Sequence, residues 1–426
     1  MMVRSKEWRV AMWGRVGLAV LVCACAAREV TAQSSGSTAL RVGTSGDYAP
    51  FSVRDVDGRP GGFDVAMAER LAHDLGRPLS FVSFLWPELV ARLRAGAFDV
   101  AMSGVTVRAD RAVTLRFTRP YAVAGAVVVV RAADATRFRR PEDVDDPSVR
   151  VAVNAGGHLE RVARQHFPRA PIRPLGDNLA LPAALTDGTA DAVVSDVFEA
   201  RTWAGELVIL GPFTRDRKAY AVGPEALELR RTIDAWLAAR ETDGWLNEQR
   251  RRWLGAGAVW TPQDAAIEAV VSAINLRLEL MPLVVAVKRR AGLPVEDAAQ
   301  ESRVLDRTRA TAVTLGLDAD AVVAFVRVQM EAAKAVEHTT DVSTSAAAGG
   351  DAPSLETVRA AVAAVSDQLI HELARSAACL REPAARGQLE QTLRKGLQAP
   401  AAMPYVGRMV EAIQHVNPAA EQGSAR

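Results

Sequence analysis

The sequence predicts an α/β region built as two lobes, followed by an all-α region. Apolar runs typical of strands alternate with helical patterns between residues 40 and 254, and the alternation occurs twice. Residues 255–258 (Gly-Ala-Gly-Ala) resemble a linker. Beyond residue 263 the strand signal disappears and Ala, Val, Leu, Arg and Glu dominate in helical spacing.

Size and composition agree with several folded domains. The 426 residues suffice for two or three domains, and 49% of them are hydrophobic. A net charge of +2 and an aromatic content of 5% argue against a nucleic-acid partner held by charge or by stacking. Three cysteines and six scattered histidines provide neither a disulfide framework nor a metal-binding pattern.

The first 32 residues predict a secretory signal peptide. A basic start, an uncharged run over residues 16–27 and the small residue Ala32 before Gln33 follow the order of such signals. The run has twelve residues and is too short to cross a bilayer. Removal of residues 1–32 leaves 47 basic and 48 acidic residues and a single cysteine, Cys379. We expect a periplasmic protein without a further membrane span, and the sequence leaves a homo-oligomer open.

The first lobe is expected to alternate strands with helices. The patterns predict strands at 40–43, 79–82 and 99–102 and helices at 65–75 and 88–94. After the apolar stretch 126–130, the second lobe repeats the alternation, with strands at 149–153 and 190–194 and helices at 159–166 and 179–185. Such alternation favours parallel sheets flanked by helices, with a cleft between the lobes.

The all-α region has its own punctuation. Gly292 and Gly316 interrupt the helical patterns of residues 263–338, and Asp318 is a plausible N-cap. Residues 339–353 are rich in Ser, Ala and Gly and predict a loop, after which helical spacing resumes over 355–415. The expected domains are therefore residues 38–255 and 259–418.

Polar residues follow several strands of the α/β region. Ser103, Thr106 and Arg111 come after one strand, and Asn154 with a Gly-Gly pair comes after another. Ligands bind at the carboxyl ends of parallel strands, and hydroxyls with a guanidinium suit a carboxylate. Each feature alone is weak, because a Gly-Gly pair is usually a turn and a single Arg is usually solvated.

Their order along the chain resembles the periplasmic binding proteins for polar amino acids, and still more their catalytic relatives, the cyclohexadienyl (prephenate/arogenate) dehydratases. The resemblance covers residues 40–254. It rests on these motifs: Gly46-Asp47-Tyr48, Gly62-Phe63-Asp64-Val65, Trp86-Pro87, Ala101-Met102-Ser103-Gly104, Asn154 with Gly156-Gly157, Asp196-Val197-Phe198-Glu199-Ala200-Arg201 and Lys218-Ala219-Tyr220.

The resemblance implies that Glu199 is a general acid. Without the motif around it, Glu199 would be interpreted as a solvated helix residue. The other residues that it implies bind the substrate are Asp47, Tyr48, Trp86, Ser103, Thr106, Arg111, Asn154, Gly156, Gly157, Asp196 and Lys218. His158 departs from the family, which more often has a hydroxyl residue there. Departure of hydroxide needs a proton, and decarboxylation in the same step forms an aromatic ring, so no metal or organic cofactor is required.

The helical region carries basic residues among apolar ones. Arg277 and Lys288 stand eleven residues apart, about three helical turns, and should face the same way. A basic pair at this spacing is usually a solvated stripe. Here the neighbours are Leu and Val, so the pair is expected to bind an anion.

Residues 263–418 resemble the secreted class of all-helical chorismate mutases. The resemblance implies that Arg277, Lys288 and Arg359 bind the substrate carboxylates and ether oxygen, with Glu337 beside that oxygen. A concerted rearrangement needs a preorganised cationic pocket and no cofactor. Two positions depart: Gln300 replaces an arginine and Ala333 a hydroxyl residue. Arg303, on the same helical face, could compensate for Gln300.

Together, the two resemblances predict a bifunctional exported enzyme of phenylalanine biosynthesis. It would convert chorismate to prephenate and then prephenate to phenylpyruvate, and the preference between prephenate and arogenate stays open. Its partners would be these small molecules. The alternatives are an amino-acid receptor of a transporter with a decayed mutase, or a helical dimerisation or sensory module.

Overall fold

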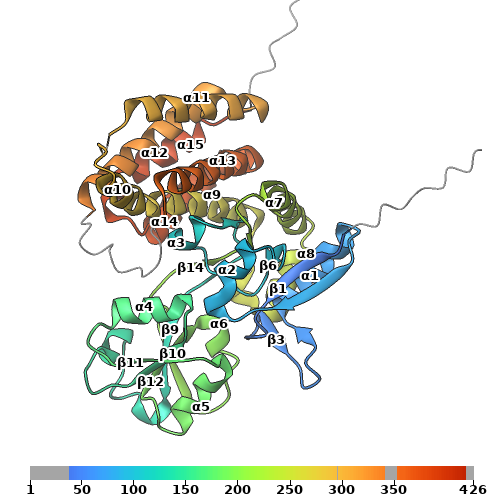
Figure 1. Ribbon diagram of the computed structural model, residues 1–426, viewed down its shortest axis with the longest axis vertical. Coiled ribbons are helices and arrows are strands. Elements are labelled where there is room, and N and C mark those ends of the chain that lie inside the picture. The colour runs from blue at the N-terminus through green and yellow to red at the C-terminus, as the bar shows by residue number, and fades with distance from the viewer. Residues whose placement is uncertain (1–37, 295, 341–352, 419–426) are drawn as a thin grey trace, which may run out of the picture. The chain divides into compact units, whose positions relative to one another are not determined.

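The computed structural model describes residues 38–294, 296–340 and 353–418 (Figure 1). The expected signal peptide and all but the ends of the loop predicted at 339–353 lie outside the described residues.

The first lobe is built on a five-stranded sheet. Its strands, in spatial order, are β5 (Leu79–Ser83), β1 (Leu40–Thr44), β6 (Val100–Ala101), β15 (Ala221–Val222) and β7 (Arg116–Phe117). The first three run parallel, whereas β15 is antiparallel to both of its neighbours. A small antiparallel sheet of β2 (Asp47–Tyr48), β3 (Ser52–Arg54) and β4 (Pro60–Gly61) lies in the same lobe.

The second lobe contains another five-stranded sheet. Its order is β11 (Ile172–Leu175), β10 (Val151–Asn154), β12 (Ala192–Asp196), β9 (Ala126–Arg131) and β13 (Leu207–Leu210). β9, expected only as an apolar connection, is an interior strand and runs antiparallel to β12. The prediction of parallel sheets is therefore wrong in part: both sheets are mixed, because strands from distant parts of the chain join each parallel core.

Helices flank both sheets. The first lobe has α1 (Phe63–Asp74), α2 (Leu89–Arg94), α3 (Ala109–Ala112), α7 (Leu227–Thr242) and α8 (Trp245–Trp253); the second has α4 (His158–His166), α5 (Leu181–Thr186) and α6 (Val197–Ala200). A two-stranded ribbon of β8 (Ala122–Ala124) and β14 (Asp216–Lys218) stands where the chain passes between the lobes.

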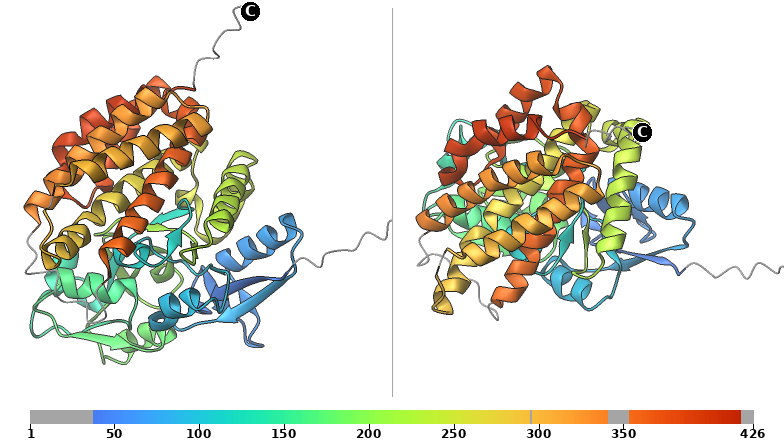
Figure 2. Two further views of the ribbon diagram at one scale, coloured as in Figure 1. Left: turned by 45° about the horizontal axis from the view of Figure 1, so that its top comes forward. Right: turned by 90° about the horizontal axis from the view of Figure 1, so that it is seen from above.

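The C-terminal region is helical throughout its described part, as predicted (Figure 2). Its helices are α9 (Pro262–Glu279), α10 (Met281–Arg290), α11 (Ala298–Thr314), α12 (Ala319–Thr339), α13 (Leu355–Leu380), α14 (Pro383–Gly396) and α15 (Val406–Gln414). Asp318 caps α12, as expected, by accepting hydrogen bonds from the backbone N–H groups of Asp320 and Ala321. Thr261 and Asp264 form a reciprocal capping box at the start of α9.

The segment Pro262–Arg290 corrects two expectations. It is long and apolar enough to cross a membrane, with a mean hydropathy of 1.8, contrary to the expectation that no segment after the signal would be. However, 78% of its most apolar stretch of 18 residues is buried inside the protein, which is typical of a core helix. The segment is also divided into α9 and α10 near Pro282, so Arg277 and Lys288 stand on successive helices.

The helical region packs on the first lobe. One apolar core contains Phe84, Leu89 and Phe117 from the lobe together with Ile274 and Leu369 from the helices. Buried ion pairs cross the same boundary. Arg119 Nη1 lies 3.5 Å from Glu372 Oε2, and Arg217 Nε lies 3.1 Å from Glu268 Oε2.

Candidate active sites

A small cavity lies where the two lobes meet. Its volume is about 20 Å³, well below the roughly 300–1,000 Å³ typical of ligand pockets, so the lobes must separate for a substrate to enter. It is lined by Tyr48, Trp86, Gly104, Thr106, Arg111, Asn154, Gly157, His158, Leu159, Asn178, Glu199 and Lys218.

Glu199 is the acid of this cavity. It stands on the short helix α6, directly after β12, and is 3% exposed. Ser195 Oγ donates to its Oε2 at 2.6 Å, and the Asn178 amide donates to its Oε1. Burial raises the pKa of Glu199 to about 8, with the nearby Asp196 and Asp47 carboxylates acting in the same direction. Near neutral pH the carboxyl group therefore holds a proton that it can donate.

A buried ion pair joins Lys218, which lines the cavity, to Asp196 behind the lining. Lys218 Nζ lies 3.1 Å from Asp196 Oδ2 and donates to Tyr48 Oη and Thr106 Oγ1, each at 3.0 Å. The other oxygen of Asp196 accepts the N–H of Phe198 and so caps α6. Asp196 Oδ1 is therefore hydrogen-bonded to the backbone, whereas Oδ2 has the ion pair with Lys218 but no hydrogen bond within the described residues. The bond to Phe198 fixes the start of the helix that carries Glu199.

Arg111 is the cation available in this cavity. It is 5% exposed and makes no ion pair within the described part of the chain. Burial, reinforced by the neighbouring Arg108, lowers the pKa of Arg111 to about 9, so it remains charged at neutral pH. A buried guanidinium without a carboxylate partner favours an anionic ligand.

Aromatic rings and a glycine form another part of the cavity wall. The Trp86 ring meets that of Tyr48 edge-on at 5.7 Å, and Trp86 Nε1 donates to Asp47 Oδ1 at 3.3 Å. Gly104 has φ +64°, and a Cβ there would lie 2.5 Å from the Tyr48 ring, so only glycine fits. The buried Asp64 accepts hydrogen bonds from Gly104, Tyr121 and Tyr220 and thereby anchors this turn.

A second, larger cavity opens within the helical region. Its volume is about 740 Å³, and it lies between α9, α10, α11, α12 and α13. Its charged and amide side chains are those of Arg277, Lys288, Asp297, Gln300, Glu301, Arg303, Arg307, Lys334, Glu337, Glu356, Arg359 and Asp367. Both signs of charge are present, and the buried charged residues among them are Arg277, Lys288 and Glu337.

Glu337 lies in the field of two buried cations. Burial raises its pKa, whereas Lys288 and Arg277 oppose that rise. Arg277 is held by hydrogen bonds to Ser366 Oγ (3.3 Å) and the Gln329 carbonyl (3.1 Å), and burial lowers its pKa to about 10. All three side chains are less than 9% exposed. Two buried cations near this carboxyl favour an anionic ligand.

The opposite wall connects α11 with α13. Arg359 Nη2 donates to Asp297 Oδ2 at 2.8 Å, and Asp297 also caps α11 through the N–H of Gln300. Arg303 donates through Nε (3.1 Å) and Nη2 (2.9 Å) to Gln300 Oε1. The guanidinium of Arg303 therefore lies next to the side-chain amide of Gln300, the residue that replaces an arginine of the family pattern.

Comparison with known proteins assigns a family to each region. The model of the bacterial extracellular solute-binding proteins, family 3, matches residues 40–256. The chain belongs to that family. The model for chorismate mutase type II matches residues 265–338, in line with the resemblance predicted for the helical region.

Three individual relatives each match about half of this chain. The chain is 37% identical to the cyclohexadienyl dehydratase of Pseudomonas aeruginosa over 224 residues, 51% of this chain and 83% of that protein. It is 27% identical to the L-cystine-binding protein TcyJ of Escherichia coli K12, across 51% of this chain and 83% of that protein. The crystal structure of AncCDT-1, an ancestral amino-acid-binding protein described as a precursor of cyclohexadienyl dehydratase, matches with 34% identity and a TM-score of 0.49. That match covers 51% of this chain and 96% of the other.

Most residues predicted for the solute-binding region meet at one place. Tyr48, Trp86, Thr106, Arg111, Asn154, Gly157, Glu199 and Lys218 all line the small cavity. Four predicted residues lie behind the lining instead: Asp47, Ser103, Gly156 and Asp196. Ser103 is fully buried and forms a hydrogen bond with Ser45 Oγ at 2.9 Å. Gly156 has φ +69° and packs against Pro87.

Asn178 is the functional neighbour that the sequence analysis missed. It donates to both the Asp47 carbonyl (3.0 Å) and Glu199 Oε1, and so ties the second lobe to the first. It follows β11 by three residues, at the carboxyl end of a parallel strand. A position just after a parallel strand could have indicated a site residue. The strand itself was not predicted, because residues 172–175 include Arg and Pro. Leu159, from α4, and Gly104 were also not predicted as site residues.

In the mutase-like region all six predicted residues line one cavity: Arg277, Lys288, Gln300, Arg303, Glu337 and Arg359. Ala333 lines it too, so the missing hydroxyl leaves an apolar patch beside Glu337. Lys334 was not predicted. It pairs with Glu301 at 2.9 Å on the rim of the cavity.

Proposed function

We propose that the protein is a bifunctional exported enzyme of phenylalanine biosynthesis. Its mutase-like region rearranges chorismate to prephenate, and its solute-binding region converts prephenate to phenylpyruvate. The observation that carries the proposal is Glu199: a carboxyl buried between the lobes, with its pKa raised to about 8, in a family whose receptors have no need of an acid there.

The dehydration uses Glu199 as the proton donor. The carboxyl proton passes to the ring hydroxyl, whose C–O bond breaks to release water. The bond from the ring to its carboxylate breaks in the same step, releases CO2 and supplies the electron pair that completes the aromatic ring. Arg111 is placed to hold a substrate carboxylate, while Trp86 and Tyr48 exclude water. The conjugate base of Glu199 then recovers a proton from water when the cleft opens.

The rearrangement needs no proton transfer to substrate carbon. Arg277, Lys288 and Arg359 hold the chorismate dianion in a reactive conformation. As the ether C–O bond breaks and the new C–C bond forms, negative charge grows on the ether oxygen. Lys288 and protonated Glu337 lie where they can stabilise that charge.

A transporter receptor is the alternative that family membership raises. An amino-acid receptor would use the Asp196 carboxylate to hold the ammonium group of its ligand. Here Asp196 Oδ1 accepts the N–H of Phe198, and the ammonium group of Lys218 already lies 3.1 Å from Oδ2, where a ligand's ammonium would have to bind. This arrangement favours the dehydratase over an amino-acid receptor.

The decisive experiment supplies chorismate to the purified full chain and follows phenylpyruvate. The proposal expects transient prephenate followed by phenylpyruvate. Prephenate that accumulates without phenylpyruvate would leave a mutase joined to a receptor. Binding of amino acids without either conversion would establish the receptor alternative.

Export is the remaining part of the proposal. The family is described as extracellular, and residues 1–32 have the composition of a signal peptide. We expect mature protein to begin near Gln33 in the periplasmic fraction. N-terminal sequencing of exported protein that finds Met1 would contradict this.

A further inference from the structure

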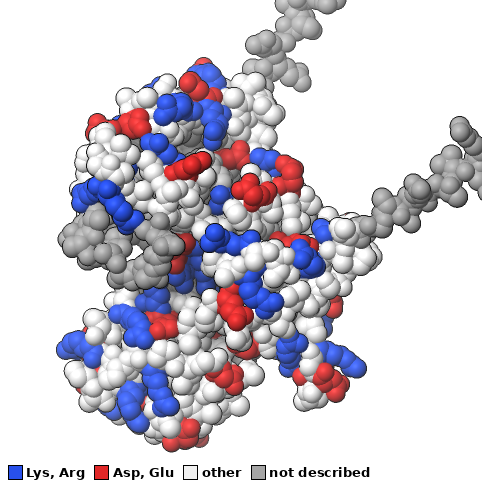
Figure 3. Space-filling model, in the orientation of Figure 1, with Lys and Arg blue, Asp and Glu red and all other residues white. Residues whose placement is uncertain are grey.

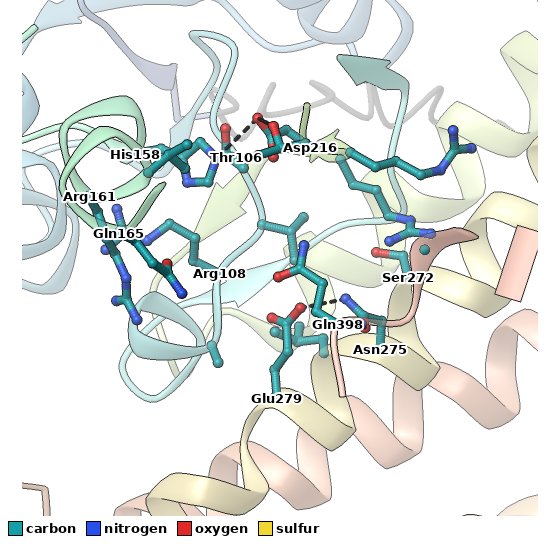
Figure 4. A pocket seen from close by; sticks show the side chains of 18 of the residues that line it. Thr106, Arg108, His158, Arg161, Gln165, Asp216, Ser272, Asn275, Glu279 and Gln398 are labelled. Atoms are coloured by element: carbon teal, nitrogen blue, oxygen red, sulfur yellow. Dashed lines mark hydrogen bonds and ion pairs between the residues drawn. The ribbon is translucent and has the colours of Figure 1, made fainter. Parts of the chain in front are cut away.

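A third cavity lies between the second lobe and the helical region. Its volume is about 690 Å³, within the range of ligand pockets. Figure 4 shows His158, Arg161 and Gln165 of α4 on one side and Ser272, Asn275 and Glu279 of α9 across from them. Gln398, from the segment after α14, completes the wall. Neither family by itself would form this cavity, because each supplies only part of its lining.

This cavity adjoins the dehydratase cavity. Thr106 and His158 line both of them. His158 Nε2 lies 3.1 Å from Asp216 Oδ2, which holds the imidazole at the boundary. Opening of the lobes, which the small volume around Glu199 requires, would move α4 and its His158 relative to Thr106 of the first lobe. The large cavity is thus positioned as the approach to Glu199.

Cations outnumber fixed anions around the approach. Five basic side chains line it, those of Arg108, Arg161, Arg215, Arg217 and Lys395, against the carboxylates of Asp110 and Asp216. A further carboxylate, that of Glu268 behind the lining, forms ion pairs with both Arg215 and Arg217. Burial also raises the pKa of Glu279 to about 7, so its charge is only partial at neutral pH. Figure 3 shows Lys and Arg side chains in the hollow between the helical region and the second lobe.

Several of these cations are incompletely neutralised. Arg108 and Arg161 share one carboxylate, that of Asp110, with Arg161 Nη1 at 3.3 Å from it. Lys395 forms no ion pair within the described residues. Arg217 is 4% exposed, and its Nη2 has no hydrogen-bond partner among the described residues. The same Nη2 lies against Gly396, so the guanidinium reaches the edge of the helical region, and a side chain at position 396 would require it to shift.

We propose that this cavity is a binding vestibule for a small organic dianion, which passes from it to the dehydratase site. The proposal rests on the function proposed above, which identifies the dianion as prephenate, the product of one region and the substrate of the other. A cleft with an excess of one sign of charge concentrates ligands of the opposite sign and raises their association rate. The helical region, in addition to its own reaction, thereby completes the entrance to its neighbour's site.

The test changes charges at the rim, far from either reacting group. Lys395→Glu alters the helical region, and Arg161→Gln alters the second lobe. At an ionic strength of about 0.02 M, each should raise KM for added prephenate about three- to tenfold with kcat unchanged. At about 0.5 M salt the difference should largely vanish, because screening shortens the range of the charges.

Neighbouring residues supply matched controls. Arg394 is next to Lys395 on α14, and Arg164 is one turn from Arg161 on α4. Neither residue lines the cavity, so Arg394→Glu and Arg164→Gln are the control variants. Both control variants should keep the wild-type KM for prephenate. All four variants should keep wild-type kinetics on chorismate, which also verifies folding.

The outcomes separate this proposal from the function on which it rests. A wild-type chain that fails to convert prephenate refutes the dehydratase and the vestibule together. Normal dehydration with an unchanged KM in Lys395→Glu and Arg161→Gln refutes the vestibule alone. Equal changes in the control variants would also refute it, because the effect would then come from overall charge.

Discussion

The two predicted active sites rely on the same chemical group in opposite surroundings. Burial raises the pKa of Glu199 to about 8; hydrogen bonds from Ser195 and Asn178 oppose the rise, and the carboxylates of Asp196 and Asp47 add to it. Glu337 lies near Lys288 and Arg277, which oppose the effect of burial. Carboxylates lie beside the acid of one site, whereas cations lie beside the acid of the other. Burial raises the pKa of both carboxyls, and the charges of their neighbours then act in opposite directions.

The cavities differ in size as well. About 20 Å³ surrounds Glu199, against about 740 Å³ in the helical region. The dehydratase site lies between two lobes joined by a strand ribbon and can open as they move. The mutase site lies among packed helices and already has room for a ligand. Catalysis in the first should therefore require a lobe motion that the second does not need.

The largest expected effect comes from Glu199→Gln. Loss of a general acid typically costs about 10²–10⁴-fold, and dehydration of prephenate should fall by this factor. Conversion of chorismate should stay normal, because the two sites share no residue. The matched control is Glu69→Gln on the exposed face of α1. Steady-state assays with each substrate measure both effects, and near-normal dehydration would show that Glu199 is not the acid.

The same variant should gain stability at alkaline pH. In the folded protein the pKa of Glu199 is raised from 4.5 to about 8. Its neutral form therefore stabilises the fold below about pH 4.5, and this contribution is lost as the pH rises through about 8. Because Gln never ionises, Glu199→Gln should melt at a higher temperature than wild type at pH 9, with a smaller gap at pH 5. Calorimetry at the two pH values measures this, and an equal gap at both would contradict the raised pKa.

Lys288→Ala and Arg359→Ala should have the next largest effect, confined to the other site. Removing a preorganised group that stabilises developing charge costs about 10²–10³-fold, so turnover of chorismate should fall by about that factor. Prephenate turnover should be unaffected. Arg289→Ala, exposed beside Lys288 on α10, is the control. Equal loss of both activities in Lys288→Ala would indicate a structural role instead.

The pH profiles of the two reactions should differ. Both acids act when protonated, so each activity falls as pH rises through the pKa of its carboxyl. For dehydration the fall should come near pH 8, approaching tenfold for each further pH unit. For the mutase it should come at lower pH, because Lys288 and Arg277 oppose the rise in the pKa of Glu337. Glu337→Gln should remove the mutase fall alone, and a profile unchanged by that substitution would exclude Glu337.

Much of this comparison could be predicted from the sequence, and the exceptions have physical causes. Periodicity located β1, α1 and α4 to within a few residues, because their apolar faces pack against a single core. The antiparallel strands β9 and β15 could not be predicted from alternation, because their partners come from distant parts of the chain. Motif context identified Glu199, while Asn178 was missed because its partners, Asp47 and Glu199, are remote in sequence.

The smallest expected effect tests the weakest position of the mutase site. Arg303 donates twice to Gln300 Oε1, and both side chains line the cavity, so its guanidinium already provides a cation near the position where the family has an arginine. A charge-assisted hydrogen bond contributes about 1.5–3 kcal/mol, against about 0.5–1.5 for a neutral one. Arg303→Ala should therefore lower kcat/KM for chorismate by roughly 1 kcal/mol, about fivefold. Gln300→Arg should bring no gain, because a second guanidinium would repel the first.

Arg309→Ala, at an exposed position of the same helix, is the control. If Gln300→Arg raises mutase efficiency while Arg303→Ala leaves it unchanged, then Arg303 does not reach the substrate. The helical site would then have no guanidinium at the position of Gln300. The cavity between the lobes, in contrast, has the guanidinium of Arg111 available for a substrate carboxylate.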